Sequence, residues 1–292
     1  MSGFSPSWLA LREPADHRSR NKDLAEALKT RFLQREKIAV VDLGCGTGSN
    51  LRATSQLLPA LQHWTLVDHD PALLDAAKAA LTVWADRCET SPKGLKLTKG
   101  ATTIHASFQQ ADLATDLDAV LDAVAKPGPD LVTASALFDL ASAKFIQTFA
   151  AAIAKRRAVF YAVLTYNGIQ RWTPRSPADQ PMTAAFHRHQ MTDKGLGLAS
   201  GPVAPVELAE AFQTFGYSVA EGDSPWRLAA ADAALVAELA TGFASAVGET
   251  KALTPLEIAA WLARTKTGSE VGHTDTLATP GLGAGMDGDG DD

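Results

Sequence analysis

The sequence is poor in cysteine, has no long apolar run and carries little net charge outside one acidic end. Its two cysteines, Cys45 and Cys88, are too few for a disulfide framework or a cysteine metal cluster. No apolar run approaches the roughly 18 residues of a membrane span. The first residues also lack the basic and apolar regions of a signal peptide. We therefore expect a cytoplasmic protein with no membrane partner.

Positive charge is also scarce. The net charge is −6, and residues 286–292 contribute −4 of it, so the rest of the chain is close to neutral. Surfaces that bind nucleic acid usually carry an excess of Lys and Arg, so this balance argues against a nucleic-acid substrate and favours a small molecule. The acidic end lacks the closing Glu and the second helix of a calcium loop, and we expect no metal there.

The chain alternates apolar runs with helix-like segments. Strands are expected at residues 38–43, 63–67, 101–108, 130–135 and 157–165. Helices are expected at residues 22–36, 50–58, 71–85, 116–125, 142–156, 206–215, 232–243 and 255–264. This alternation is typical of an α/β protein with a doubly wound, mostly parallel sheet, for which we expect seven strands. Ligands of such sheets bind at the carboxyl ends of the strands.

Gly- and Pro-rich stretches suggest the boundaries. We expect a cap segment at residues 1–36, irregular up to residue 20, and a main domain at residues 37–265. Residues 89–100 are interpreted as a loop, residues 217–228 as a closing hairpin, and residues 167–202 as a lid insertion. The polar, Gly-rich residues 266–292 are expected to be a disordered tail.

The most specific motif is Asp42-Leu43-Gly44-Cys45-Gly46-Thr47-Gly48, which follows an apolar run and precedes a helix-like stretch. Its glycines permit a tight strand-to-helix turn whose backbone can approach a ligand. The spacing D-x-G-x-G-x-G differs from the G-x-G-x-x-G of dinucleotide-binding proteins, which argues against an NAD-dependent oxidoreductase. It resembles the class I S-adenosylmethionine (SAM)-dependent methyltransferases. The resemblance implies a Rossmann-like methyltransferase fold with SAM as the cofactor.

The resemblance also implies a set of cofactor-binding residues, most of which follow strands. They are Asp42 for the methionine amino group, Gly44, Gly46 and Gly48 for methionine and ribose, Asp68 for ribose, Asp112 and the Leu113 backbone for adenine, and, without a stated role, Cys45, His69 and Ser135. For Asp68 and Asp112 the alternative is an ordinary helix-capping role. Arg12 and Arg18 in the cap segment are candidates to pair with the carboxylate of the cofactor or of an acidic substrate, or else are solvated.

The catalytic candidates are Asp139, Tyr166 and His189. Methyl transfer mainly requires alignment of nucleophile and methyl group, and a base is needed when the acceptor carries a proton. The N-P-P-Y motif, which relatives that methylate amino groups or nucleic-acid bases carry after the fourth strand, is absent. Its absence argues against N-methylation of DNA or RNA bases. His187, His189 and Asp193 have no H-E-x-x-H-type spacing, so no metal is expected.

We therefore expect a SAM-dependent methyltransferase that modifies an O, N or C nucleophile of a small molecule. Two alternatives stay open. One is a SAM-dependent enzyme with a protein or RNA acceptor or with chemistry other than methyl transfer. The other is a non-catalytic SAM-binding partner subunit. Fold alone does not decide between them.

Overall fold

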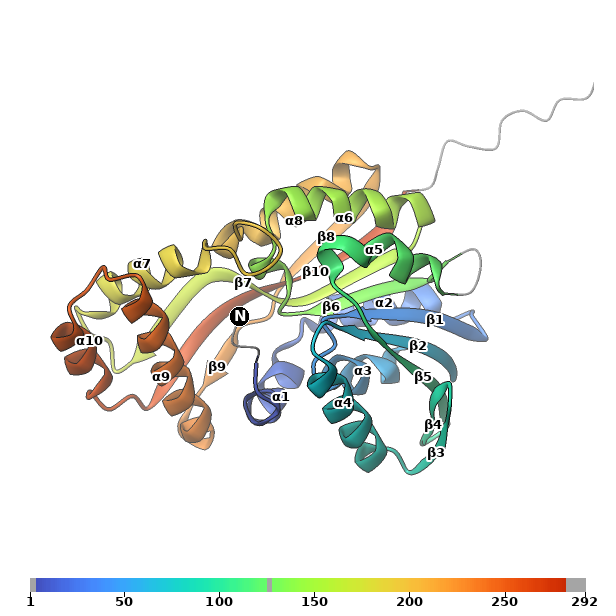
Figure 1. Cartoon of the computed structure of the whole chain (residues 1–292), viewed down its shortest axis with the longest axis horizontal. Helices are drawn as coiled ribbons and strands as arrows, with labels where there is room; N and C mark the ends of the chain where they lie inside the picture. Colours follow the sequence, from blue (N-terminus) through green and yellow to red (C-terminus); the bar gives the residue numbers. More distant parts are fainter. Residues whose placement is uncertain (1–3, 125–127, 282–292) are drawn as a thin grey trace, which may run out of the picture.

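A single twisted sheet runs through the whole protein and is flanked by helices (Figure 1). The computed structural model describes residues 4–124 and 128–281. The strand order is β3-β4-β5-β2-β1-β6-β7-β10-β8, and β9 pairs with β10. The strands are β1 (Lys37–Leu43), β2 (Leu61–Asp68), β3 (Arg87–Ser91), β4 (Gly94–Lys99), β5 (Thr102–Gln110), β6 (Leu131–Ser135), β7 (Val159–Thr173), β8 (Tyr217–Asp223), β9 (Trp226–Leu228) and β10 (Gly268–Pro280).

The helices of the described ranges lie between these strands and ahead of the first one. They are α1 (Pro6–Ser19), α2 (Lys22–Phe32), α3 (Ser49–Thr54), α4 (Pro71–Trp84), α5 (Leu113–Asp122), α6 (Ala143–Arg156), α7 (Asp179–Gln190), α8 (Ala204–Thr214), α9 (Ala233–Glu249) and α10 (Pro255–Leu262).

Five neighbouring strands, β5, β2, β1, β6 and β7, are parallel to one another. β10 lies antiparallel between β7 and β8. The predicted doubly wound, mostly parallel sheet is thus confirmed, and its seven central strands are extended by β3 and β4 at one edge and by β9 beside β10. The five parallel strands share one direction, so their carboxyl ends lie along the same edge of the sheet. This is the edge at which such folds bind ligands.

Local signals set several helix starts. Asp70 caps α4 by accepting a hydrogen bond from the Ala72 N–H at 2.8 Å, and Pro71 occupies the first helical position. Thr254 and Glu257 form a reciprocal capping box at the start of α10. Both starts were predicted from the sequence and both are confirmed.

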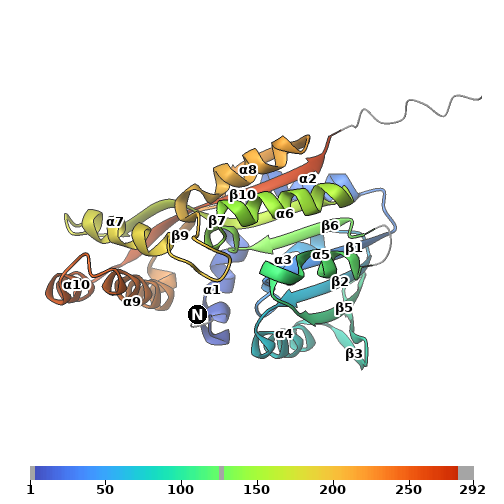
Figure 2. The ribbon, with the colours of Figure 1, turned by 45° about the horizontal axis from the view of Figure 1, so that its top comes forward.

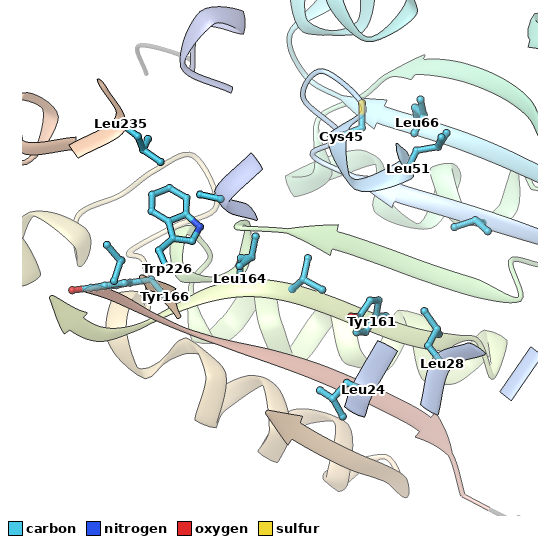
Figure 3. Close-up of a cluster of buried hydrophobic side chains, with 14 of the residues drawn as sticks. Leu24, Leu28, Cys45, Leu51, Leu66, Tyr161, Leu164, Tyr166, Trp226 and Leu235 are labelled. Atoms are coloured by element: carbon cyan, nitrogen blue, oxygen red, sulfur yellow. The ribbon is translucent and has the colours of Figure 1, made fainter. Parts of the chain in front are cut away.

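Two layers of helices cover the sheet (Figure 2). On one face α5, α6 and α8 contribute the apolar side chains that pack against the central strands. On the other face the buried side chains of α2, α3 and α4 pack with those of the strands. This second core includes Cys45 and Leu51 beside the glycine turn as well as Tyr166 and Trp226, and these members are labelled in Figure 3. The glycine turn and the far half of β7 therefore belong to one packed body.

β7 and β10 are long enough to extend beyond the central sheet (Figure 1). Their outer halves, together with β9, α7, α9 and α10, form what we call the second lobe. Its core is aromatic: Trp172, Phe243 and Trp261 have ring centroids 5.2–5.6 Å apart, and Phe186 stacks on Phe243 at 4.5 Å.

Two segments that were interpreted as unstructured are strands. The loop expected at residues 89–100 is wrong: the hairpin of β3 and β4 pairs with β5, and it buries Leu95 and Leu97. The disordered tail expected from residue 266 is also wrong up to Pro280, because β10 there is a central strand between β7 and β8. Two of the glycines that suggested disorder allow close neighbours in the sheet: a Cβ on Gly268 would lie 2.6 Å from the Leu228 carbonyl oxygen, and one on Gly272 would lie still closer to the Asn167 Oδ1. Residues 282–292 lie outside the described ranges.

Three further expectations are corrected. Residues 217–228 do not form a hairpin, because β8 and β9 each pair with β10 instead of with each other. The expected lid at 167–202 begins as the continuation of β7 to Thr173 and includes α7. The N-terminal residues expected to be irregular form α1, whose cap Ser5 accepts a hydrogen bond from the Trp8 N–H at 3.1 Å. Ion pairs hold α1 on both sides, through Glu13 to Arg52 of α3 and through Arg18 to Asp232 ahead of α9.

By length and composition alone, the segment Ala230–Glu249 is able to cross a membrane, and it is the one such helix in the described ranges. This is weak evidence, because core helices of water-soluble proteins pass the same test. Leu235, Phe243 and Val247 of this segment are buried in the protein core. The expectation of no membrane partner stays a prediction.

Candidate functional site

The glycine turn between β1 and α3 has the conformation that its sequence requires. Gly44, Gly46 and Gly48 have φ values of 62°, 53° and 76°, in the left-handed region that favours glycine. The turn is held to the next strand by the Cys45 N–H, which donates to the Val67 carbonyl at 2.9 Å. The three alternate glycines therefore serve the backbone path itself.

The three predicted acidic residues lie along one edge of the sheet. β1, β2 and β5 are adjacent and parallel, so Asp42, Asp68 and Asp112 stand at or just after the carboxyl ends of neighbouring strands. Asp68 pairs in register with Gln110, two residues before Asp112. The expected grouping of these carboxylates is confirmed.

Asp42 is fully buried beneath the turn. Its Oδ1 accepts a hydrogen bond from the Asn50 Nδ2 at 2.6 Å, and its Oδ2 has no partner among the described residues. Burial raises the pKa of Asp42 to about 7, against the opposing effects of Asn50 and the Arg20 charge. Asn50 also donates to Thr133 at 3.1 Å. Asn50 was missed from the sequence, although it follows the last glycine by only two residues.

Both oxygens of Asp68 have backbone partners. Oδ2 accepts from the Gly46 N–H at 2.9 Å, and Oδ1 accepts from the Asp70 N–H at 3.0 Å. The neighbouring His69 is exposed, with its Nδ1 3.3 Å from Oδ1. Asp68 thus connects β2 to the glycine turn. Its predicted contact with a ribose stays a prediction.

Asp112 has the helix-capping role that was the alternative for it. Its Oδ1 accepts a hydrogen bond from the Ala114 N–H at 2.9 Å, at the start of α5. Leu113 is the first residue of that helix, so its N–H has no acceptor within the helix. An N–H of this kind can meet a ring nitrogen, as the resemblance implied. The capping role leaves the Asp112 Oδ2 for the predicted adenine contact.

α1 lies directly over the glycine turn. A Cβ atom on Gly46 would come within 3.0 Å of the Leu9 Cδ1. One face of α1 holds α3: Glu13 pairs with Arg52 at 2.7 Å between Oε1 and Nε, and the His17 Nε2 lies 2.9 Å from the Ser49 hydroxyl. Burial lowers the pKa of His17, and the Arg20 charge lowers it further.

Arg12 and Arg18 are both paired with carboxylates of the chain. The Arg12 Nε donates to Asp16 at 2.9 Å, and its guanidinium lies 4.9 Å from the centre of the Trp226 ring. Arg18 pairs with Asp232 at 2.7 Å. In this structure both arginines connect α1 to the second lobe, a role the sequence did not indicate.

Two catalytic candidates, Asp139 and Tyr166, are brought together. Asp139 lies in a short 3₁₀ turn after β6, is 7% exposed, and its Oδ1 has no partner among the described residues. Burial raises the pKa of Asp139 to about 6, opposed by backbone amides and by the charge of Arg12. Burial also raises the pKa of Tyr166, and the charge of Asp139 raises it further. The Tyr166 phenol therefore keeps its proton.

The third candidate, His189, faces elsewhere. Its Nε2 lies 3.1 Å from Glu249 of α9 and 3.2 Å from Lys194. The histidine that contacts Tyr166 is His187, whose Nε2 lies 3.0 Å from the phenol oxygen. The segment is helical, so two residues that are two positions apart point in different directions. Burial lowers the pKa of His187, so the ring is neutral near pH 7.

The structure also places the remaining predicted residues, Cys45 and Ser135. Cys45 is buried, and burial together with the charge of Asp42 raises the pKa of its thiol, so the thiol keeps its proton near neutral pH. Ser135 ends β6 in register with Val163. Within the described ranges, no three His, Cys, Asp or Glu side chains come together to hold a metal ion. A hollow of about 800 Å³ between α9 and α10 is lined by none of the predicted residues.

Comparison with known proteins finds structural similarity only. No protein-family model matches the chain, and no curated protein matches it in sequence. Among solved structures it is similar to the cyclopropane synthase MmaA2 from Mycobacterium tuberculosis, with 12% identity, a TM-score of 0.48, and 88% of this chain and 83% of that chain covered. It is also similar to a cyclopropane-fatty-acyl-phospholipid synthase-like protein from Lactobacillus casei, with 14% identity, a TM-score of 0.47 and coverage of 91% and 98%.

A third similar structure is the precorrin-6Y C5,15-methyltransferase from Geobacter metallireducens, with 12% identity, a TM-score of 0.41 and coverage of 88% and 89%. Similarity at these levels carries no argument about function. The chain's own strand order and directions show the doubly wound, mostly parallel α/β sheet that was expected.

Proposed function

We propose that the protein binds SAM and transfers its methyl group to a small molecule. One observation carries the proposal: three glycines in the left-handed conformation and three strand-end carboxylates share one edge of the sheet. Asp68 also holds the turn and Asp112 also caps α5, but packing of the turn does not account for the buried Oδ2 of Asp42, which has no partner among the described residues. Action in the cytoplasm, without a membrane or nucleic-acid partner, is a proposal from composition.

The residues present fit this cofactor. The unpartnered Oδ2 of Asp42 is a buried acceptor beneath the turn, suited to an amino group held directly or through water. Asp68 supplies a carboxylate that can accept hydrogen bonds from two ribose hydroxyls. The Leu113 N–H and the Asp112 Oδ2 are available for the edge of an adenine ring. The glycine spacing, by contrast, does not suit a pyrophosphate at a helix N-terminus.

The bound cofactor would supply an activated methyl group on a sulfonium. The chain's own residues would hold the acceptor in line with that group and remove a proton from it. Asp139 and the Tyr166–His187 pair are the candidates for the second task, because they lie beyond the carboxyl ends of β6 and in β7. A protein or RNA acceptor, another SAM-dependent reaction, and a non-catalytic binding role are the alternatives that product analysis must separate.

Titration calorimetry with S-adenosylhomocysteine tests the proposal. We expect the wild type to bind, and Asp68→Asn to weaken binding at least about tenfold, since one charged acceptor is lost. Asp70→Asn is the matched control, because it changes a neighbouring carboxylate that caps α4. Absence of binding by the wild type would remove the proposed function, and equal binding by the Asp68 variant would remove Asp68 from the site.

A further inference from the structure

Asp139 is a buried carboxylate whose hydrogen bonding is incomplete. The residue is 7% exposed, and its Oδ1 has no hydrogen-bond partner in the described part of the chain. The backbone amides of Asp139 itself and of Tyr166 stabilise its charged form. A buried acceptor normally has a donor, and leaving one without a donor is costly. The site therefore favours a ligand that donates a hydrogen bond.

The nearest cation does not neutralise Asp139. Arg12 is close enough to lower the pKa of Asp139, but its Nε and Nη2 donate to Asp16 at 2.9 and 3.2 Å. Asp16 is also 7% exposed. The single positive charge of Arg12 thus faces two buried carboxylates, Asp16 and Asp139. One of the two negative charges has no matching positive charge. A ligand that brings a positive charge would balance the group.

Tyr166, whose pKa the charge of Asp139 raises, belongs to a cluster of aromatic rings. The Tyr166 ring lies 6.0 Å from Phe186 and 6.4 Å from His273, and His273 lies 5.4 Å from Trp226. Burial lowers the pKa of His273 to about 3, so this ring adds no positive charge. The faces of tyrosine and tryptophan rings attract cations, and the Trp226 ring already holds the Arg12 guanidinium.

We propose that the methyl acceptor is an amine, and that the Oδ1 of Asp139 binds its nitrogen. The inference rests on the proposed methyl transfer and narrows its acceptor from O, N or C to N. A hydroxyl offers one donor and no charge, and a carboxylate substrate would be repelled. An ammonium supplies both the hydrogen bond and the charge that the group around Asp139 lacks.

The reaction with an amine balances without a further reactant. A protonated amine first gives one proton to the Asp139 carboxylate, which frees the nitrogen lone pair. That pair forms the new nitrogen–carbon bond, while the carbon–sulfur bond of the donor breaks and its electron pair stays on sulfur. The proton on Asp139 then passes to solvent.

The test uses the full chain saturated with S-adenosylhomocysteine and a panel of aliphatic and arylalkyl amines, each paired with its isosteric alcohol and carboxylate. Binding is followed by ligand-observed NMR and calorimetry. We expect the best amine to bind at least about tenfold more tightly than its alcohol and carboxylate. In Asp139→Asn this preference should disappear, while affinity for S-adenosylhomocysteine changes less than about twofold.

Two controls keep the outcomes distinct. Asp75→Asn changes an exposed carboxylate of α4 and should leave the amine preference intact. Asp139→Glu should restore part of the preference if charge is what matters, even where the Asn variant has lost stability. If S-adenosylhomocysteine binds but no amine is preferred over its alcohol, or if Asp139→Asn keeps the preference, this inference is wrong. If S-adenosylhomocysteine does not bind, the proposed function fails first.

Discussion

The phenol oxygen of Tyr166 and the Nε2 of His187 lie 3.0 Å apart and join β7 to α7. Burial keeps the phenol protonated and the imidazole neutral near pH 7. In that state the phenol donates and the imidazole accepts. The pair connects β7, near Asp139, to α7 of the second lobe.

The first prediction compares the two histidines of α7. We expect His187→Gln to lower kcat about tenfold to a hundredfold, as loss of a proton acceptor does, with little change in S-adenosylhomocysteine affinity. His189→Gln should keep kcat within about twofold, because His189 faces Glu249. The measurement is steady-state methyl transfer to the best acceptor. An effect confined to His189→Gln would restore the original candidate.

A second prediction concerns the pH dependence of kcat, which should reflect the protonation of His187. Its pKa is lowered from 6.5, mainly by burial, so the neutral ring predominates at neutral pH. We expect kcat of the wild type to fall as the pH decreases below about 6.5, where the ring takes up a proton. In His187→Gln this limb of the profile should shift or disappear. An unchanged acidic limb in that variant would assign it to another group.

A third prediction concerns Asp42. Its folded-state pKa of about 7 is above the unfolded value, so its contribution to stability is present at low pH and is lost as the pH rises towards 7. Asp42→Asn removes this dependence and keeps an acceptor for Asn50. Between about pH 4 and pH 8, the stability of the variant relative to wild type should rise by about 2–4 kcal/mol. Urea unfolding of both proteins at each pH measures the difference.

The same substitution should weaken S-adenosylhomocysteine binding, because Asp42 is assigned to the amino group of the ligand. A variant that is more stable at high pH and yet binds less tightly would separate the binding role from folding. Equal pH dependence of stability in the two proteins would mean that Asp42 is ionised in the folded state, and would contradict the prediction.

Local signals made the glycine turn and the strand ends around it predictable. The glycine turn, Asp42 and Asp68 lie within one strand–turn–helix–strand unit, whose parts contact one another over a short stretch of chain. The capping residues Asp70 and Asp112 also act on the helices that directly follow them. Such short-range features depend on neighbouring residues, so the turn and the Asp70 cap are predictable, whereas the cofactor roles of these residues stay predictions.

The rest depends on contacts between distant parts of the chain. The sequence of β10 predicts disorder because the partners that bury it, β7 and β8, lie far away in sequence. His187 was passed over in favour of His189 because the choice depends on how α7 faces β7. The role of α1 depends on ion pairs such as Arg18–Asp232, which no spacing rule reveals.

A fourth prediction tests the attachment of α1 to α3. Arg52 is 8% exposed and pairs with Glu13, so Glu13→Gln leaves a largely buried cation with a weaker partner. We expect a loss of about 1–3 kcal/mol in unfolding free energy and faster amide exchange in α1. Glu26→Gln, which breaks an exposed pair with Lys29, should cost less than about 1 kcal/mol. Equal exchange of α1 in both variants would contradict the attachment.

The last prediction separates backbone strain from the contact between α1 and the glycine turn. Gly46 and Gly100 have nearly the same φ, 53° and 56°, but a Cβ on Gly46 would lie 3.0 Å from Leu9, and one on Gly100 would have no atom within 4 Å. Gly100→Ala should therefore cost only the left-handed penalty of about 1–2 kcal/mol. Gly46→Ala should cost more and should also weaken S-adenosylhomocysteine binding. Adding Leu9→Ala should recover the excess cost, because the clash is with that side chain. Thermal and urea unfolding of the four proteins, with calorimetric titration, measures both effects. Equal costs for the two glycine variants would show that α1 does not press on the turn.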